Sequence, residues 1–245
     1  MDTQFDCIAK EFSSTVNQTK EYVRVPLFNK LVGEVKGKSV ADFGCGDGFF
    51  TRLLAKKLAS SVIGVDYSKQ LIDEAVLKEK KDLLGIKYVL ADVRTLHLGE
   101  QVDVITAIYL LDYAKSKEDL FRMVSSIYNH LNKGGSFCAV VPHPKTKPMK
   151  DFEYERRVTA VNGSATIIDG DELKCEIKKD GSLFDFNFYY YSRETYEKAL
   201  KEVGFKQISW IEPIVSPEGL EKFGKEYWAG VLKNPTTIGL KCIKE

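Results

Sequence analysis

The chain has 245 residues, of which 44% are hydrophobic and 29% are charged. This balance is that of a globular protein and argues against extended disorder, and the length suits one α/β domain with an insertion. Lys and Arg total 36 against 35 Asp and Glu, a formal net charge of +1. A chain this neutral has no overall electrostatic attraction to nucleic acid or to an anionic membrane.

Cysteine usage and the N-terminus predict a cytoplasmic protein. The five cysteines are scattered, and no pair has the spacing of a metal site. An odd count favours reduced thiols over a disulfide framework. The N-terminus lacks a basic start followed by an apolar run, and no apolar stretch is long enough to span a bilayer. We expect a monomer or a homodimer without membrane or nucleic-acid partners.

Strands and helices alternate over the first part of the chain. Short apolar runs predict strands at Ser39–Phe43, Ser61–Val65, Ile86–Leu90, Val102–Ile108 and Ser136–Val141. Helical patterns predict one helix over Phe49–Leu58, one that begins after Ser68, and one that begins after Ser116 and runs through Leu131 to Gly134. This alternation predicts a parallel, doubly wound sheet, and ligands of such sheets bind beyond the carboxyl ends of the strands.

Residues 145–191 have a different pattern, which predicts a small antiparallel insertion. Asp180 and Gly181 form a typical hairpin turn. Beyond it Phe184, Phe186 and Phe188 alternate with polar residues, so one strand face is aromatic. We interpret this aromatic face as the insertion's own core in preference to a platform for stacking bases.

The main domain resumes after the insertion. A helix is predicted over Ser192–Val203, ended by Gly204, and strands over Phe205–Ile211 and Thr236–Ile243 bring the sheet to seven. The predicted organisation is therefore a main α/β domain of residues 1–144 and 192–245, with residues 1–37 as a helical cap. Residues 145–191 would act as a lid.

The most specific motif, Asp42-Phe43-Gly44-Cys45-Gly46-Asp47-Gly48, lies between the first strand and the next helix. Its glycines permit a tight turn and a close approach of ligand to backbone. A dinucleotide site would have the spacing G-x-G-x-x-G without a preceding acid. Here the spacing is G-x-G-x-G, and Asp42 precedes it. A carboxylate suits the ammonium and sulfonium of S-adenosylmethionine (SAM) better than a pyrophosphate.

At this motif the chain resembles the class I SAM-dependent methyltransferases, whose first motif has the form D/E-x-G-x-G-x-G. The order of the elements over residues 38–142 follows that family. The resemblance implies a Rossmann-like, seven-stranded sheet, SAM as cofactor and S-adenosylhomocysteine (SAH) as product. It also implies cofactor contacts at Asp42, Gly44, Cys45, Gly46 and Gly48.

Acids that follow the next two strands extend the resemblance. Asp66, followed by Tyr67, ends the second strand, where a carboxylate can accept hydrogen bonds from both ribose hydroxyls. An ordinary acid at a helix entry is the alternative. After the third strand, the family's contacts to adenine would fall at Ala91, Asp92 and Val93.

The end of the fourth strand would line the methionine part of SAM, with backbone contacts at Ala107 and Ile108. Tyr109, Asp112 and Tyr113 would then face the substrate, although Tyr109 could equally be a packing residue.

The remaining candidates lie on the substrate side. His143, between two prolines at the end of the fifth strand, could take a proton from a nucleophile, or it could be a solvent-exposed turn residue. Tyr190 and Trp228 could form a flat, apolar pocket for a ring-containing acceptor. His130 is expected on a helix surface. No acidic metal-binding triad is recognisable, and we predict no metal.

Three further segments, FDCIAKEF, IYLLDYAKSKEDL and VSPEGLEKFGKEYWAGVLKNPTTIGL, are similar to small-molecule methyltransferases of the toxoflavin (azapteridine N-methyltransferase) type. This resemblance does not fix the substrate. From the aromatic residues of the insertion and of the C-terminal segment, we expect in-line methyl transfer to a small, ring-containing acceptor. The insertion and the N-terminal segment around Phe5, Phe12 and Tyr22 would cover it. The alternatives are a protein or RNA methyltransferase, a spermidine-synthase-like aminopropyl transferase, and a non-catalytic SAM-binding regulator.

Overall fold

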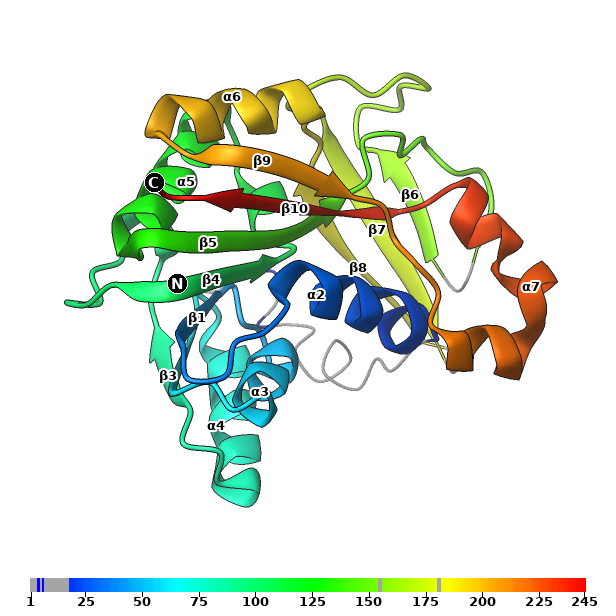
Figure 1. Cartoon of the computed structure of the whole chain (residues 1–245). Coiled ribbons are helices and arrows are strands. Elements are labelled where there is room, and N and C mark those ends of the chain that lie inside the picture. Colours follow the sequence, from blue (N-terminus) through cyan, green and yellow to red (C-terminus); the bar gives the residue numbers. More distant parts are fainter. Residues whose placement is uncertain (1–3, 5, 7–17, 154–155, 180–181) are drawn as a thin grey trace.

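The computed structural model describes residues 4, 6, 18–153, 156–179 and 182–245. A seven-stranded sheet forms its centre, and the strands are β1 (Ser39–Phe43), β2 (Ser61–Asp66), β3 (Lys87–Leu90), β4 (Val102–Ile108), β5 (Leu131–Pro142), β9 (Lys206–Ile211) and β10 (Thr237–Ile243). Their order is β3-β2-β1-β4-β5-β10-β9 (Figure 1). β1 to β5 pair in parallel, whereas β10 is antiparallel to both β5 and β9.

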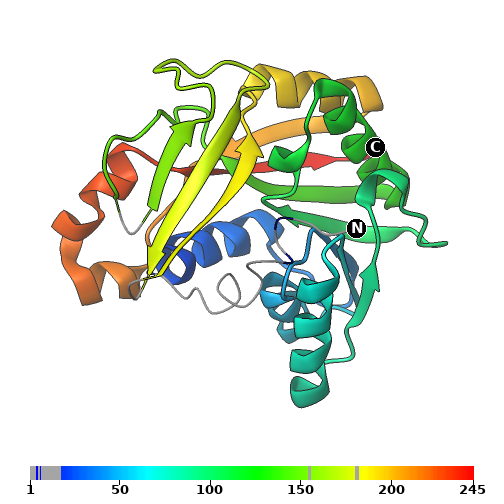
Figure 2. The ribbon, with the colours of Figure 1, turned by 180° about the vertical axis from the view of Figure 1, so that it is seen from behind.

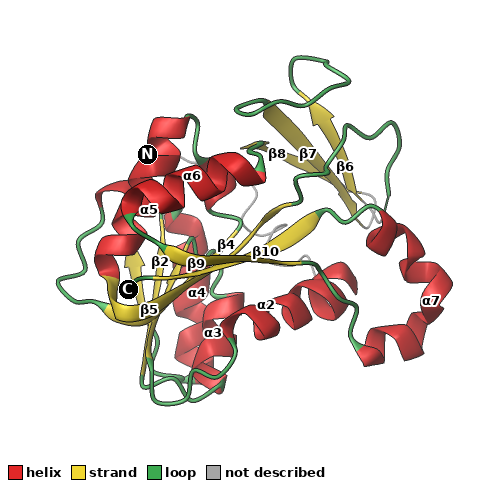
Figure 3. Cartoon of the chain, turned by 45° about the horizontal axis from the view of Figure 1, so that its top comes forward, coloured by secondary structure: helices red, strands yellow, loops and turns green. Residues whose placement is uncertain are grey.

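Helices cover both faces of this sheet (Figure 3). They are η1 (Lys20–Arg24), α2 (Val25–Val32), α3 (Phe49–Lys56), α4 (Lys69–Asp82), η2 (Val93–Thr95), η3 (Leu111–Tyr113), α5 (Lys117–His130), α6 (Arg193–Val203) and α7 (Pro217–Lys233). α5 and α6 pack on one face in a core that includes Phe137 and Leu200. α2 and α3 pack on the other face, where Phe28 and Leu54 are fully buried.

The predicted helix boundaries hold where a local capping residue sets them. Ser68, Ser116 and Ser192 each accept a hydrogen bond from the backbone N–H three residues later. Gly204 ends α6 with φ of 116°, a conformation that favours glycine. These boundaries need only neighbouring residues, so the sequence sufficed to predict them.

Two predictions around α5 are wrong, for tertiary reasons. The helix ends at His130 and not at Gly134, because Leu131 pairs with Val102 of β4 and begins β5. His130 is buried and not on the helix surface. Its Nδ1 donates to the Ser126 carbonyl at 2.7 Å, and its Nε2 accepts from the Leu98 N–H at 3.2 Å.

A second, three-stranded sheet carries β6 (Arg156–Ala160), β7 (Glu172–Lys179) and β8 (Ser182–Tyr189) in antiparallel order β6-β7-β8. It stands apart from the main sheet, as the reverse view shows (Figure 2). Its buried side chains include Val158, Leu173 and Phe188. The predicted Rossmann-like sheet with a small antiparallel insertion is confirmed, although the turn predicted at Asp180 and Gly181 lies outside the described residues.

Within the described ranges, no helix is both long enough and apolar enough to cross a membrane.

Candidate active site

A cavity of about 690 Å³ lies where the small sheet faces the carboxyl ends of the parallel strands. Its wall combines the loop after β1, the ends of β2, β3 and β4, the helix η1, and residues of β6, β7 and β8. Ligand sites typically span roughly 300–1,000 Å³, so the cavity has room for a ligand of substantial size.

The glycine loop after β1 forms one side of this cavity. Gly44 and Gly46 have φ values of 72° and 54°, and both line the wall. Among the described residues, a Cβ added to Gly46 would meet no atom within 4 Å, which leaves room for a ligand to approach this backbone. The loop is therefore a cradle of the kind that the chemistry of SAM requires.

Asp42 supports the loop from below. Its carboxylate is 1% exposed, and its two oxygens accept hydrogen bonds from Thr106 and Thr51, both at 2.7 Å. Burial raises the pKa of Asp42 to about 6, although the hydrogen bonds from the two threonine hydroxyls act to lower it. Asp42 lines the cavity and is mostly ionised at neutral pH, but its oxygens already have partners. Its carboxylate therefore joins β1 to β4 and α3.

Asp66, at the end of β2, connects the loop to the next helix. Its Oδ2 accepts from the Gly46 N–H and its Oδ1 from the Ser68 N–H, both at 2.8 Å. Asp66 and the neighbouring Tyr67 line the cavity. A carboxylate held in this way presents its remaining lone pairs in a defined direction, as hydrogen bonds to ribose hydroxyls require.

Ala91, Asp92 and Val93 line the cavity beside β3, as predicted for the adenine end. The Asp92 carboxylate is paired with Arg94, whose Nη2 lies 2.6 Å from Oδ2. Partial burial acts to raise the pKa of Asp92, but the hydrogen bonds from Arg94 lower it overall. An adenine amino group would share this carboxylate with Arg94.

Residues 40–135 match a family model described as a methyltransferase domain. The fold is similar to that of a Listeria monocytogenes protein assigned as a SAM-dependent methyltransferase, with 25% identity, a TM-score of 0.64, and coverage of 89% of this chain and 95% of that one. Residues 40–135 of the chain therefore form a SAM-dependent methyltransferase domain. This assignment agrees with the G-x-G-x-G loop and with Asp66.

Two curated relatives are similar to parts of this chain. A ubiquinone biosynthesis O-methyltransferase of Coxiella burnetii is 35% identical over 102 residues, 41% of this chain and 42% of its own length. The N-demethylindolmycin N-methyltransferase of Streptomyces griseus is 24% identical over 181 residues, 73% of each chain. The chain spans about half the length of the first curated relatives that it matches.

Five of the predicted site residues do not line the cavity: Gly48, Ala107, His143, Tyr190 and Trp228. Ala107 is fully buried in the core under α5 and α6, while Ile108, the next residue of β4, does reach the wall. Alternation along the strand explains this difference.

Gly48 is needed for packing and not for contact with the cavity. Its φ is 77°, and a Cβ there would overlap the Tyr88 hydroxyl and lie 2.9 Å from Tyr88 Cζ. We expect Gly48→Ala to lower the free energy of unfolding by about 2–4 kcal/mol, from left-handed strain plus overpacking. Gly163→Ala is the control, because Gly163 has φ of 72° with no atom within 4 Å of an added Cβ. Urea denaturation measures the free energy of unfolding of both variants. Equal losses of stability in Gly48→Ala and Gly163→Ala would contradict the overlap with Tyr88 as a cause.

The His143 side chain is buried and does not line the cavity, so the alternative of a solvent-exposed turn residue is wrong. The side chain is 1% exposed. Its Nε2 lies 3.0 Å from Glu212 Oε2, and its Nδ1 accepts from the Lys145 N–H at 3.0 Å. Burial lowers the pKa of His143, against Glu212, which acts to raise it. The ring therefore ties the turn after β5 to the segment after β9.

The two predicted aromatic substrate contacts also serve packing. The Tyr190 hydroxyl donates to the Pro144 carbonyl at 2.7 Å. Trp228 is fully buried, and its Nε1 donates to the Gly219 carbonyl at 2.8 Å within α7. Tyr22, predicted to help cover the site, packs on Trp228 with ring centroids 6.2 Å apart. Phe5 and Phe12 lie outside the described residues.

Tyr109, Asp112 and Tyr113, predicted to face the substrate, do line the cavity, together with two arginines that sequence reasoning missed. These are Arg24, the last residue of η1, and Arg156, the first of β6. One signal was present in the sequence: Arg156 shares the strand face of Val158 and Ala160, so a charge stands on an apolar face.

Asp112 is a buried carboxyl at the cavity wall, 2% exposed. Its Oδ1 has no hydrogen-bond partner among the described residues. Burial raises the pKa of Asp112 to about 7, against a hydrogen bond from its own backbone and the charge of Arg156, which lower it. The Asp112 carboxylate in turn acts on Tyr113 and Tyr196, where it adds to the burial that raises the pKa of each phenol.

Within the described part of the chain, no group of three or more His, Cys, Asp or Glu side chains could hold a metal ion.

Proposed function

We propose that the protein transfers a methyl group from SAM to a small, ring-containing molecule inside the cavity. The observation that carries this proposal is the small sheet, which covers the carboxyl ends of the main strands with Phe186, Phe188 and Tyr189 on the cavity wall. Aromatic side chains opposite a cofactor site suit a flat acceptor and exclude water. The similarity to N-demethylindolmycin and (S)-coclaurine N-methyltransferases supports the same substrate class.

The cofactor side of the cavity supplies binding and orientation. When bound, SAM supplies a methyl group activated by its positively charged sulfur. The backbone from Gly44 to Gly46 allows a close approach, and Asp66 offers acceptor lone pairs to the ribose. The ionised Asp42 adds negative charge beneath the loop, which favours a cationic ligand.

Asp112 is the group best placed to take a proton from an acceptor that must lose one. It lines the cavity, and one of its oxygens has no partner among the described residues. A pKa of about 7 suits a base that works at neutral pH. His143 lacks these features, since both of its ring nitrogens are engaged away from the cavity wall.

A fractionation experiment tests the proposed function. The purified protein is incubated with methyl-labelled SAM and either the low-mass or the macromolecular fraction of one cell extract. We expect label to enter the low-mass fraction only, because the acceptor site lies within the cavity. Label confined to protein or RNA would establish the macromolecular alternative. Binding of SAM without transfer to either fraction would favour the non-catalytic regulator.

A further inference from the structure

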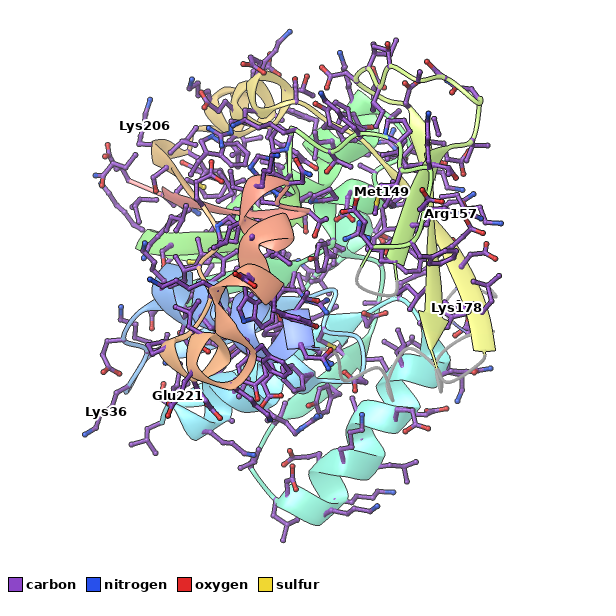
Figure 4. The ribbon with its side chains drawn as sticks, turned by 90° about the vertical axis from the view of Figure 1, so that its right-hand side faces the viewer. Lys36, Met149, Arg157, Lys178, Lys206 and Glu221 are labelled. Atoms are coloured by element: carbon purple, nitrogen blue, oxygen red, sulfur yellow. The ribbon has the colours of Figure 1, made fainter. Side chains whose placement is uncertain are left out.

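Arg156 carries a positive charge into the covered end of the cavity. It stands on the face of β6 that buries Val158 and Ala160, and it lines the cavity wall. Arg157, the next residue, lies on the opposite face of the strand, at the outer side of the small sheet (Figure 4). Its guanidinium makes a two-point pair with Glu176, at 2.8 and 2.9 Å.

Arg156 has no comparable partner within the described chain. Its Nε is buried without a hydrogen bond, and its guanidinium forms no ion pair with a described carboxylate. The groups that act on its charge are Tyr109, Asp112 and Cys175, and the Cys175 side chain also forms a hydrogen bond with it. Burial raises the pKa of the Cys175 thiol, which is therefore uncharged at neutral pH. A protein rarely buries a guanidinium with an unused donor unless a ligand supplies the acceptor.

Arg24 adds a second positive charge to the same end of the cavity. It stacks over Tyr109, with its guanidinium carbon 5.8 Å from the ring centroid. Arg24 and Arg156 repel each other electrostatically. The acids that line the cavity beside them are Glu153, Glu172, which accepts a hydrogen bond from Asn187, and Asp112, which is only partly ionised near pH 7. Among the described residues, none of these acids forms an ion pair with Arg156.

We propose that Arg156, together with Arg24, binds an oxyanion of the methyl acceptor, either a carboxylate or a phosphate. This inference rests on the proposed small-molecule function. Guanidinium groups recognise both oxyanions through paired N–H donors. Asp66 and Asp92 mark the cofactor end, at β2 and β3, whereas Arg156 lies near Asp112 and Cys175. The oxyanion therefore belongs to the acceptor and not to SAM.

Matched binding probes test the proposal without knowledge of the natural acceptor. Benzoate, phenyl phosphate and neutral benzamide are titrated by calorimetry into the SAH complex at constant ionic strength. We expect benzoate or phenyl phosphate to bind at least about tenfold more tightly than benzamide, because only these two offer a guanidinium a pair of negatively charged oxygens. The tighter of the two identifies the oxyanion.

Arg156→Met should abolish this preference and leave SAH affinity unchanged, whereas the control Arg157→Met should retain it. Without ligand, Arg156→Met should melt no lower than wild type, because it removes a buried charge that lacks an ion pair. An arginine with a purely structural role would give a lower melting temperature instead. Arg156→Lys should keep only part of the preference, because lysine lacks the paired donors.

Several outcomes would overturn the inference. One is a wild-type protein without any preference for the two oxyanions. Another is a preference that persists in Arg156→Met, and a third is a large loss of SAH affinity in that variant, which would assign Arg156 to the cofactor carboxylate. A neutral acceptor methylated equally by wild type and Arg156→Met would also overturn it and leave the proposed function intact. Methyl transfer to macromolecules alone would instead overturn the proposed function.

Discussion

Asp112→Asn is expected to lower turnover by about 10²–10⁴-fold, the usual contribution of a positioned general base. SAH affinity should stay unchanged, because Asp112 lies on the acceptor side. In wild type, turnover should rise with pH through about 7, as the Asp112 carboxyl ionises, and this rise should be absent from the variant. The pH–rate profile, measured with the acceptor found by fractionation, checks both expectations.

The same substitution has a stability signature that needs no acceptor. The pKa of Asp112 is about 7 in the folded chain, above the value of about 3.9 for an unfolded aspartate. The folded state therefore binds an extra proton between these pH values, and stability falls as pH rises through this window. Above pH 7, Asp112→Asn should raise the free energy of unfolding by on the order of 2–4 kcal/mol.

Asp185→Asn is the control for both measurements, because Asp185 is a half-exposed acid of the small sheet, paired with Lys174 at 3.4 Å. It should change neither the pH–rate profile nor the pH dependence of unfolding. Turnover of Asp112→Asn close to the wild-type rate would exclude Asp112 as a base. If Asp112→Asn changed the stability but not the turnover, the raised pKa of Asp112 would reflect its burial only.

Asp66→Ala is expected to weaken binding of SAM and SAH by about 1.5–3 kcal/mol, roughly 10–150-fold, because it removes charged hydrogen bonds. The Asp66 carboxylate accepts from Gly46 and Ser68, so the substitution also loosens the glycine loop. Calorimetry with SAH gives the affinity, and circular dichroism verifies the fold. Neither the wild type nor Asp66→Ala should bind NAD tightly, since the glycine loop lacks the dinucleotide spacing.

Asp73→Ala provides the matched control, because Asp73 is an exposed acid of α4 paired with Lys69 at 2.6 Å. It should leave SAH affinity unchanged. Equal affinity of wild type and Asp66→Ala for SAH would place Asp66 outside the ribose site. In that case Asp66 would serve only to hold the backbone of the glycine loop and of the start of α4.

The cofactor half of the site was predictable because its information is local. The G-x-G-x-G spacing, the acid at the end of β2 and the alternation of strands and helices each lie within a few consecutive residues. In a doubly wound sheet, successive strand ends meet at one edge, so local motifs assemble without further information. The structure places Gly44, Gly46, Asp66 and Asp92 on one cavity wall.

The acceptor half depends on contacts between distant residues. His143 was a candidate base from its place at a strand end, but its partner Glu212 lies 69 residues further along the chain. Trp228 was a candidate platform, yet it closes a small core with Tyr22, which comes from the opposite end of the sequence. No local pattern could have predicted either pairing.

The sequence alone thus determined the sheet, its glycine loop and its cofactor class, because spacing and periodicity specify backbone geometry directly. Only the tertiary structure decided which side chains line the cavity. The approach of the small sheet to the end of β4 buries Asp112, which raises its pKa, and brings Arg156 to the same wall. Burial and charge depend on every neighbouring element, and this is why these two residues became candidates for catalysis and acceptor binding only once the chain was folded.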